Sequence, residues 1–166
     1  MEFRLYSISV KGIFFPKYTI ESEGDLIYTV KRKGVTLMSG LGFYDEMGNE
    51  LMTLKRKFAL FKIQFELTRG DIHHAMIELD RENLKHNYIV DSPYRYYFVD
   101  GNLWMTEFTV TEDNDNEVAK ISRKRRKKKN RYGIAMTEKA DADLVLSLCI
   151  AIELTRRIKR TQRSGG

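Results

Sequence analysis

Cysteine occurs once in this chain of 166 residues, and proline only twice. The single thiol, Cys149, cannot form an internal disulfide, so the fold does not need an oxidising compartment. The few prolines, together with nine tyrosines and nine phenylalanines, favour β-strands. A hydrophobic content of 42% is typical of a globular protein. We therefore expect one compact domain that is rich in strands.

Long apolar runs are missing as well. No stretch of the sequence approaches the ~20 apolar residues that a membrane-spanning helix needs. The first residues, Met1 to Arg4, lack the basic segment and apolar run of a secretory signal. We therefore expect a cytoplasmic protein, whose contact with a membrane would be peripheral and at the inner surface.

The motifs of common catalytic sites are also absent, since the sequence has no glycine-rich phosphate loop, nucleophile elbow or zinc-ligand spacing. Asp113, Asp115 and Glu117 alternate like the first ligands of a calcium loop. The match then ends, because Val118 stands where that loop needs glycine and Lys124 where it needs glutamate. A polar turn explains these acids better.

Histidine is scarce, with three residues in all. His73 and His74 are adjacent in an expected strand, so they point to opposite faces and cannot share a metal. His86 is the only other histidine, and Cys149 lies in an apolar segment that gives its thiol no activation. The sequence therefore predicts a non-enzymatic protein with no metal and no cofactor.

Charge is present in abundance but is unevenly distributed. Residues 120–166 hold 15 basic and four acidic side chains, a net charge of +11. Residues 1–119 hold 14 basic and 19 acidic side chains, a net charge of −5. Such a local concentration of positive charge indicates a binding surface for an anionic partner.

The pattern of most of the chain is that of short strands. Over residues 61–68, Phe61, Ile63, Phe65 and Leu67 alternate with polar residues, which gives one dry and one wet face. Similar strands are expected around Leu26, Tyr28 and Val30, around Tyr94, Tyr96 and Phe98, and around Phe108 and Val110. Turn sequences separate the strands at 22–25, 45–49, 69–71, 91–93, 100–102 and 113–116. This arrangement predicts an antiparallel sandwich or barrel.

Two of these strands resemble each other. The same types of residue occur in both strands at a constant offset of 67 positions: Glu50, Leu51, Leu54, Arg56 and Lys57 correspond to Glu117, Val118, Ile121, Arg123 and Lys124. Each copy follows a polar turn and ends in a basic pair. The repeat is compatible with two related halves of a sheet or with chance similarity between amphipathic strands.

The segment Leu144–Ile152 is apolar on every side and predicts a helix. Asp141 or Asp143 can cap its start, and the arginines after Glu153 suit its C-terminal part. At ~1.5 Å per residue, its apolar part is about half as long as a bilayer core is thick. We therefore expect the sheet to surround this helix.

These segments together resemble the tubby C-terminal-like superfamily, in particular its LURP-one-related and phospholipid-scramblase-like branch. The segments that carry the resemblance are Tyr18–Ile20 with Gly24–Val30, Asp45–Lys57, Asp100–Asn102 with Phe108, Glu117–Lys124, and Asp141–Glu153.

The resemblance implies a mainly β fold, a closed antiparallel barrel of about twelve strands around a central C-terminal helix. It implies one domain over residues 1–160, with the core helix at 141–160 and a flexible tail at 161–166. Tubby-type members bind phosphoinositide headgroups through surface Lys and Arg, and scramblase-like members are linked to lipid movement. The resemblance therefore implies a lipid-binding module.

The strongest functional signal is the basic run in residues 120–131. An anionic membrane surface would relieve the mutual repulsion of these charges, at ~1 kcal/mol per basic residue. The expected headgroup-binding residues are Lys120, Arg123, Lys124, Arg125, Arg126, Lys127, Lys128, Lys129 and Arg131, with Lys55, Arg56 and Lys57 from the related strand. The arginines and lysines of 156–163 would extend this surface if the helix ends on the same side.

Three other interpretations stay open at this point. Nucleic-acid phosphates would satisfy the same cations, although Tyr132 is the only aromatic residue beside the run that could stack on a base. A protein partner with an acidic face is another candidate. The run could also be a solvated hairpin tip without a ligand. The sequence specifies neither the ligand nor the oligomeric state.

Overall fold

The computed structural model describes residues 2–35, 39–60, 62–80, 87–126 and 129–165, with the backbone alone for residues 80, 87 and 126. Twelve strands and one helix account for most of this chain. The strands are β1 (Phe3–Lys11), β2 (Lys17–Ser22), β3 (Asp25–Arg32), β4 (Leu41–Tyr44), β5 (Glu50–Lys57), β6 (Ile63–Arg69), β7 (Ile72–Asp80), β8 (Asn87–Asp91), β9 (Tyr96–Gly101), β10 (Glu107–Glu112), β11 (Glu117–Arg126) and β12 (Lys129–Thr137). The helix is α1 (Ala142–Ser164).

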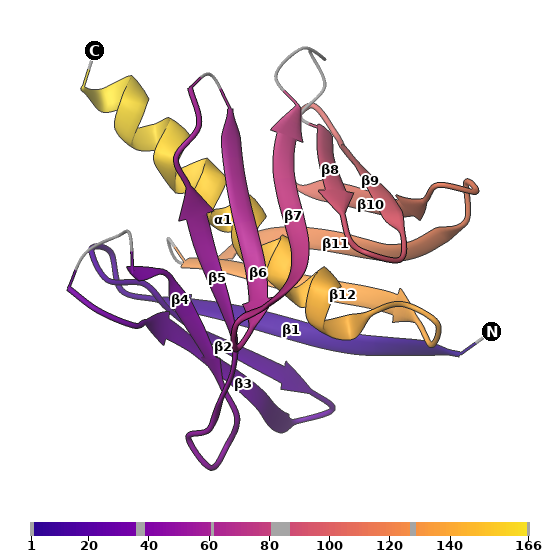
Figure 1. The fold of residues 1–166 in the computed structure, drawn as a ribbon, viewed down its shortest axis with the longest axis horizontal. Coiled ribbons are helices and arrows are strands. Elements are labelled where there is room, and N and C mark those ends of the chain that lie inside the picture. The colour runs from indigo at the N-terminus through magenta and orange to yellow at the C-terminus, as the bar shows by residue number, and fades with distance from the viewer. Residues whose placement is uncertain (1, 36–38, 61, 81–86, 127–128, 166) are drawn as a thin grey trace.

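Each strand pairs antiparallel with its neighbours in the chain, and β1 pairs with β12 to close the barrel. The closing pair runs from Phe3 opposite Thr137 to Ser9 opposite Arg131. Short connections produce this order directly, since consecutive antiparallel strands joined by tight turns become neighbours. The expected closed antiparallel barrel around a C-terminal helix is confirmed (Figure 1).

The alternation of the strands matches their burial in most places. In β6, Ile63, Phe65 and Leu67 are buried, as expected, whereas Phe61 lies outside the described residues. In β9 the aromatic residues Tyr96 and Phe98 point outward and Tyr97 and Val99 face the core. The inner face of this strand is therefore set by residues 97 and 99, and the expected strand begins at residue 96.

The helix fills the barrel. The nine residues Leu144–Ile152 are each at most 2% exposed, because strands surround them on all sides. Asp141 caps the helix by accepting a hydrogen bond from the backbone N–H of Leu144 at 3.2 Å. The helix continues to Ser164, so residues 161–164 are helical rather than part of the expected tail. Among the residues described, no helix has the length and apolar character that a bilayer span needs.

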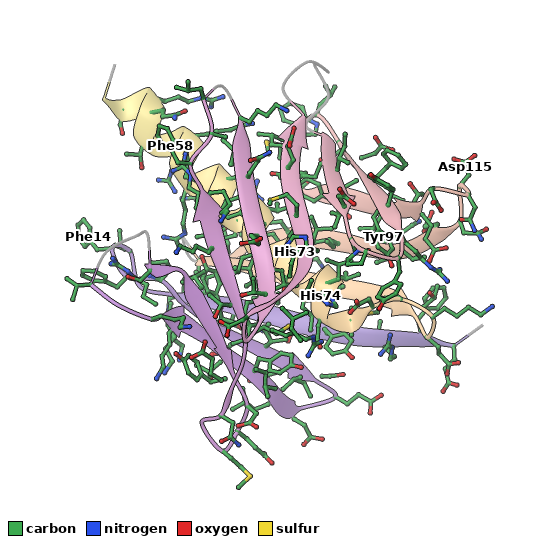
Figure 2. All side chains as sticks on the ribbon, viewed as in Figure 1. Phe14, Phe58, His73, His74, Tyr97 and Asp115 are labelled. Carbon is green, nitrogen blue, oxygen red and sulfur yellow. The ribbon has the colours of Figure 1, made fainter. Side chains whose placement is uncertain are left out.

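The antiparallel order gives the barrel two different ends. The connections β1–β2, β3–β4, β5–β6, β9–β10 and β11–β12 lie at the end where the C-terminal part of α1 leaves the barrel, which we call the helix-exit end. The turns after β2, β4, β6, β8 and β10 lie at the opposite end, with the N-terminus of α1. Figure 2 shows this separation, with Phe14 and Phe58 on the side of the view where α1 leaves the barrel and Asp115 on the opposite side.

Candidate anion-binding site

The two ends of the barrel carry opposite charge. Acidic residues occupy the turns of the opposite end, among them Glu23, Asp25, Asp45, Glu46, Asp71, Asp91, Asp113 and Asp115. Basic residues occupy the strand ends and loops of the helix-exit end, among them Lys11, Lys17, Arg32, Lys33, Lys57, Lys62, Arg125 and Lys129. The net charge of +6 therefore conceals a strongly dipolar molecule.

A pocket of about 580 Å³ at the helix-exit end, which we call the basic pocket, concentrates the positive charge. Of its described lining residues, seven are Lys or Arg and none is Asp or Glu. The seven are Lys11 from β1, Arg123 and Arg125 from β11, Lys129 from β12, and Arg156, Arg157 and Arg160 from α1. Like charges this close favour the binding of an anion with several negative oxygens.

The periodicity of the strand and helix explains why these cations meet. Ile121 in β11 faces the core, so Arg123 and Arg125, two and four residues later, face the same way where the barrel opens. The Arg123 guanidinium is held by a 3.1 Å hydrogen bond from Nε to the carbonyl oxygen of Met105. On α1, residues 156, 157 and 160 lie on one face because helical neighbours are three or four positions apart. The C-terminal part of α1 therefore emerges beside the hairpin formed by β11 and β12, which carries the basic run.

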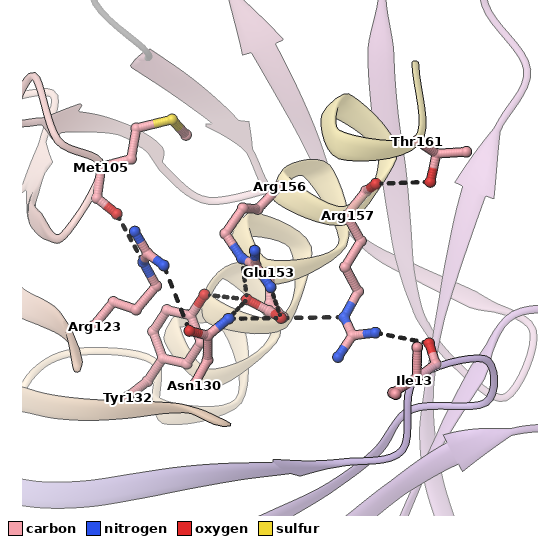
Figure 3. A network of polar contacts seen from close by, with 9 residues as sticks. All are labelled: Ile13, Met105, Arg123, Asn130, Tyr132, Glu153, Arg156, Arg157 and Thr161. Atoms are coloured by element: carbon pink, nitrogen blue, oxygen red, sulfur yellow. Dashed lines mark hydrogen bonds and ion pairs between the residues drawn. The ribbon is translucent and has the colours of Figure 1, made fainter. Parts of the chain in front are cut away.

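A buried carboxylate, Glu153, lies beneath the basic pocket and is only 1% exposed (Figure 3). Arg156 donates to it from Nε at 3.0 Å and Nη2 at 2.8 Å, and Arg157 donates from Nε at 3.1 Å. Tyr132 donates its hydroxyl proton, and the Asn130 amide lies between Glu153 and Arg123. Glu153 thus fixes two of the pocket's arginines.

The protonation states of this cluster follow from its contacts. Burial by itself raises the pKa of Glu153, but hydrogen bonds from Arg156 and Tyr132 and the charges of both arginines outweigh it, so its pKa lies below the ordinary value. Burial and the neighbouring carboxylate raise the pKa of Tyr132, which stays a neutral donor. The cluster therefore holds one buried negative charge against two positive charges, and the basic pocket keeps a positive excess.

Three of the predicted residues, Arg123, Arg125 and Lys129, line the basic pocket. Lys124 and Arg131 are exposed on the same hairpin. The side chain of Arg126 and the residues Lys127 and Lys128 lie outside what the structure describes.

Lys120 lies toward the other end of β11 and pairs with Glu117 at 3.4 Å, so it is not brought to the pocket. In β5, Lys55 is exposed, Lys57 pairs with Glu66 at 3.3 Å, and Arg56 lines a second pocket. The anion-binding role of all twelve predicted residues stays a prediction.

Sequence reasoning missed Lys11 and Glu153 as parts of this site. Lys11 ends a strand that is distant in sequence, and it reaches the basic pocket only because β1 pairs with β12. The signal for Glu153 was present in the sequence as an isolated acid between an apolar run and a basic run. A lone carboxylate at such a boundary is expected to pair with the cations one turn later.

The second pocket, which we call the apolar pocket, has a volume of about 500 Å³ and adjoins the first. It is lined mainly by hydrophobic side chains of the β1–β2 loop, β4, β5, β6 and α1, and it shares Ile13 and Arg157 with the basic pocket.

The two described histidines contact different acidic side chains, and His86 lies outside the described residues. His73 contacts Glu66 and His74 contacts Asp141, each at 2.9 Å, so the two rings have separate partners. Across the described ranges, no group of three His, Cys, Asp or Glu side chains could hold a metal ion. Cys149 is buried, and burial raises the pKa of its thiol.

Comparisons with known proteins agree with this architecture. The sequence matches the LURP-one-related (LOR) family over residues 6–153, and no curated protein matches it. The X-ray structure of a protein from Arabidopsis thaliana is similar with a TM-score of 0.67, at 16% identity, over 92% of this chain and 91% of that chain. At this identity the likeness shows the fold alone, and the narrower resemblance to scramblase-like proteins stays a prediction. Because the family match runs from β1 to Glu153, the chain belongs to the LURP-one-related family.

Proposed function

We propose that this protein is a non-enzymatic module that binds anionic phospholipid surfaces through its helix-exit end. The observation that carries the proposal is that this end combines the basic pocket with exposed apolar loop tips. Membership of the LURP-one-related family supports it, because that family shares a tubby-like fold of the lipid-binding type.

The loop tips at the helix-exit end expose large apolar side chains to solvent. Eight such residues are between 69 and 94% exposed: Ile13, Phe14, Phe15, Val35, Phe58, Leu60, Leu103 and Trp104. At this level of exposure, the turns and strand ends of the opposite end show only three among the described residues, Met47, Ile72 and Tyr94. Apolar and aromatic side chains surrounded by cations are typical of surfaces that enter the headgroup region of a bilayer.

Charge gives the protein its orientation on such a surface. An anionic leaflet attracts each nearby Lys or Arg by about 1 kcal/mol, and the attraction falls off within a Debye length of ~8 Å. The basic pocket would face the lipid, and the acidic turns would lie beyond that distance on the far side. The dipolar barrel therefore favours one docking orientation.

Nucleic acid is a weaker explanation of the same cations. Exposed aromatic residues such as Phe14 and Trp104 could stack on bases. Exposed aliphatic residues such as Ile13 and Leu60 have no comparable role with bases, whereas both kinds insert between lipids. The mixture of aromatic and aliphatic side chains at the loop tips favours a bilayer over nucleic acid as the partner.

Sedimentation with vesicles tests the proposal. We expect binding to vesicles that contain phosphatidylserine, weakening as salt rises, and little binding to pure phosphatidylcholine. The double variant R125Q/K129Q removes two cations of the basic pocket and should weaken binding by about tenfold or more, since each contributes ~1 kcal/mol. The matched control K120Q/K139Q removes the same charge elsewhere on the barrel and should bind almost normally.

Two results would contradict the proposal. One is the absence of any difference between anionic and neutral vesicles for the unchanged protein. The other is an equal loss of binding in both double variants, since that would reflect net charge rather than the basic pocket. A gel shift with single-stranded DNA at physiological salt that exceeds vesicle binding would favour the nucleic-acid alternative.

A further inference from the structure

The apolar pocket has the properties of a site for a hydrocarbon chain. Leu41, Leu54 and Phe65 form its buried inner wall and are at most 6% exposed. Leu154 and Ile158 of α1 form another side, and Phe14 and Pro16 contribute from the β1–β2 loop. A volume of about 500 Å³ is within the range of small-molecule sites. Arg32, Arg56 and Arg157 also line this pocket, but its apolar walls offer water no hydrogen bonds, so a hydrocarbon chain would replace water favourably there.

The apolar pocket and the basic pocket meet at a single shared wall. Ile13 and Arg157 line both of them. Arg157 is fixed there, because its Nη1 donates to the carbonyl oxygen of Ile13 at 3.1 Å and its Nε to Glu153 at 3.1 Å. Figure 3 shows Arg157 held between Glu153 and Ile13, so the side chain that both linings share has a fixed position.

We propose that the two pockets together bind one phosphorylated amphiphile, with its phosphate in the basic pocket and a hydrocarbon chain in the apolar pocket. This inference rests on the proposed function and gives the ligand of that surface a chemical class. A headgroup alone would leave the apolar pocket empty, and a fatty chain alone would not use the seven cations. The ligand is either a free single-chain lipid or a bilayer phospholipid with one chain drawn into the protein.

The chain-length dependence of binding provides the direct test. Inorganic phosphate, hexyl phosphate, octyl phosphate and decyl phosphate are titrated calorimetrically into the full-length protein below their critical micelle concentrations. Each methylene that enters the apolar pocket should tighten binding by up to about fourfold. The gain should stop once the pocket is full, whereas partition into a bilayer would continue to rise. Octyl glucoside, which lacks the phosphate, should bind far more weakly than octyl phosphate.

Two tryptophan variants test whether the hydrocarbon chain of the ligand lies in the apolar pocket. Thr161 is exposed and lines the apolar pocket, so T161W narrows it without removing a core side chain. Binding of octyl phosphate to T161W should fall to the level of inorganic phosphate, which should itself bind as before. The control S164W introduces the same residue three positions later on α1, at a side chain that does not line the apolar pocket, and should bind octyl phosphate normally.

The outcomes separate this inference from the proposed function. Binding to anionic vesicles without any chain-length dependence would overturn the two-pocket site and leave the proposed function intact. Chain-length dependence without vesicle binding would support the site, assign it to a free amphiphile and overturn the surface-binding proposal. If neither is found, or if T161W and S164W behave alike, the two-pocket site is wrong.

Discussion

Replacing Glu153 with glutamine removes one buried negative charge and almost no volume. In the folded protein this carboxylate accepts three hydrogen bonds from Arg156 and Arg157, whose side chains are 17 and 26% exposed. The variant keeps one acceptor oxygen but leaves the two guanidinium groups without their counterion. They then repel each other beside the other cations of the basic pocket.

The expected loss of stability can be worked out from these contacts. A hydrogen bond between charged groups is worth about 1 kcal/mol more than a neutral one, and E153Q converts three of them. Removal of one partner of a buried ion pair costs about 3–5 kcal/mol. Because both arginines keep some access to water, we take the lower value of about 3 kcal/mol. For a domain of this size that corresponds to a Tm lower by about 6–12 °C.

Thermal unfolding followed by circular dichroism measures this loss, with and without added phosphate. Phosphate should raise the Tm of E153Q more than that of the unchanged protein, because an anion in the basic pocket replaces part of the missing charge. The control E50Q makes the same chemical change in an exposed pair with Lys33, where about 0–1 kcal/mol is expected. A Tm of E153Q within 2 °C of the unchanged protein would refute the role given to Glu153.

Two further predictions concern stability. D141A should destabilise the protein by about 1 kcal/mol, since it removes the cap on Leu144 and the contact with His74. D141N should keep most of the cap. Denaturant unfolding that shows no difference in stability between the two variants would contradict this prediction. Hydrogen bonds from His73 and Lys57 hold the pKa of Glu66 below its ordinary value, and the pKa of Glu153 is lowered as well. The stability that these two carboxylates contribute is therefore present above about pH 4.5 and is lost as the pH falls further. Unfolding curves between pH 6 and 3 should show this fall, with a shallower slope for E153Q.

The barrel and its central helix could be predicted from the sequence because local signals agree with one another. All six expected turns lie where one strand ends and the next begins. The segment 144–152 is apolar on every side and therefore has to be completely buried, as it is in the structure. The two similar strands are β5 and β11, which lie six strands apart in the ring of twelve and therefore on opposite sides of the barrel. This position is what two related halves would produce.

The site was only partly predictable because it depends on pairings that are distant in sequence. Arg123 and Arg125 were foreseen from their charge, but their inward orientation depends on the register of β11 with its neighbours. The position of Lys11 in the site and the formation of the apolar pocket depend on the closure of β1 against β12 and on the length of α1. The outward face of Tyr96 and Phe98 was not apparent, because aromatic residues occupy both faces of β9.

The central position of α1 has a consequence for how the chain acquires its structure. Synthesis proceeds from β1 onward, and the segment that fills the barrel is made after all twelve strands. Until residues 144–152 leave the ribosome, the inner faces of the strands lack the helix that they pack against, and the open sheet exposes strand edges that can pair with other chains. Closure of the barrel, which joins residues more than a hundred positions apart, must also wait for β12 and makes folding slow. The helix is therefore the last component made, and its burial commits the sheet to its native form.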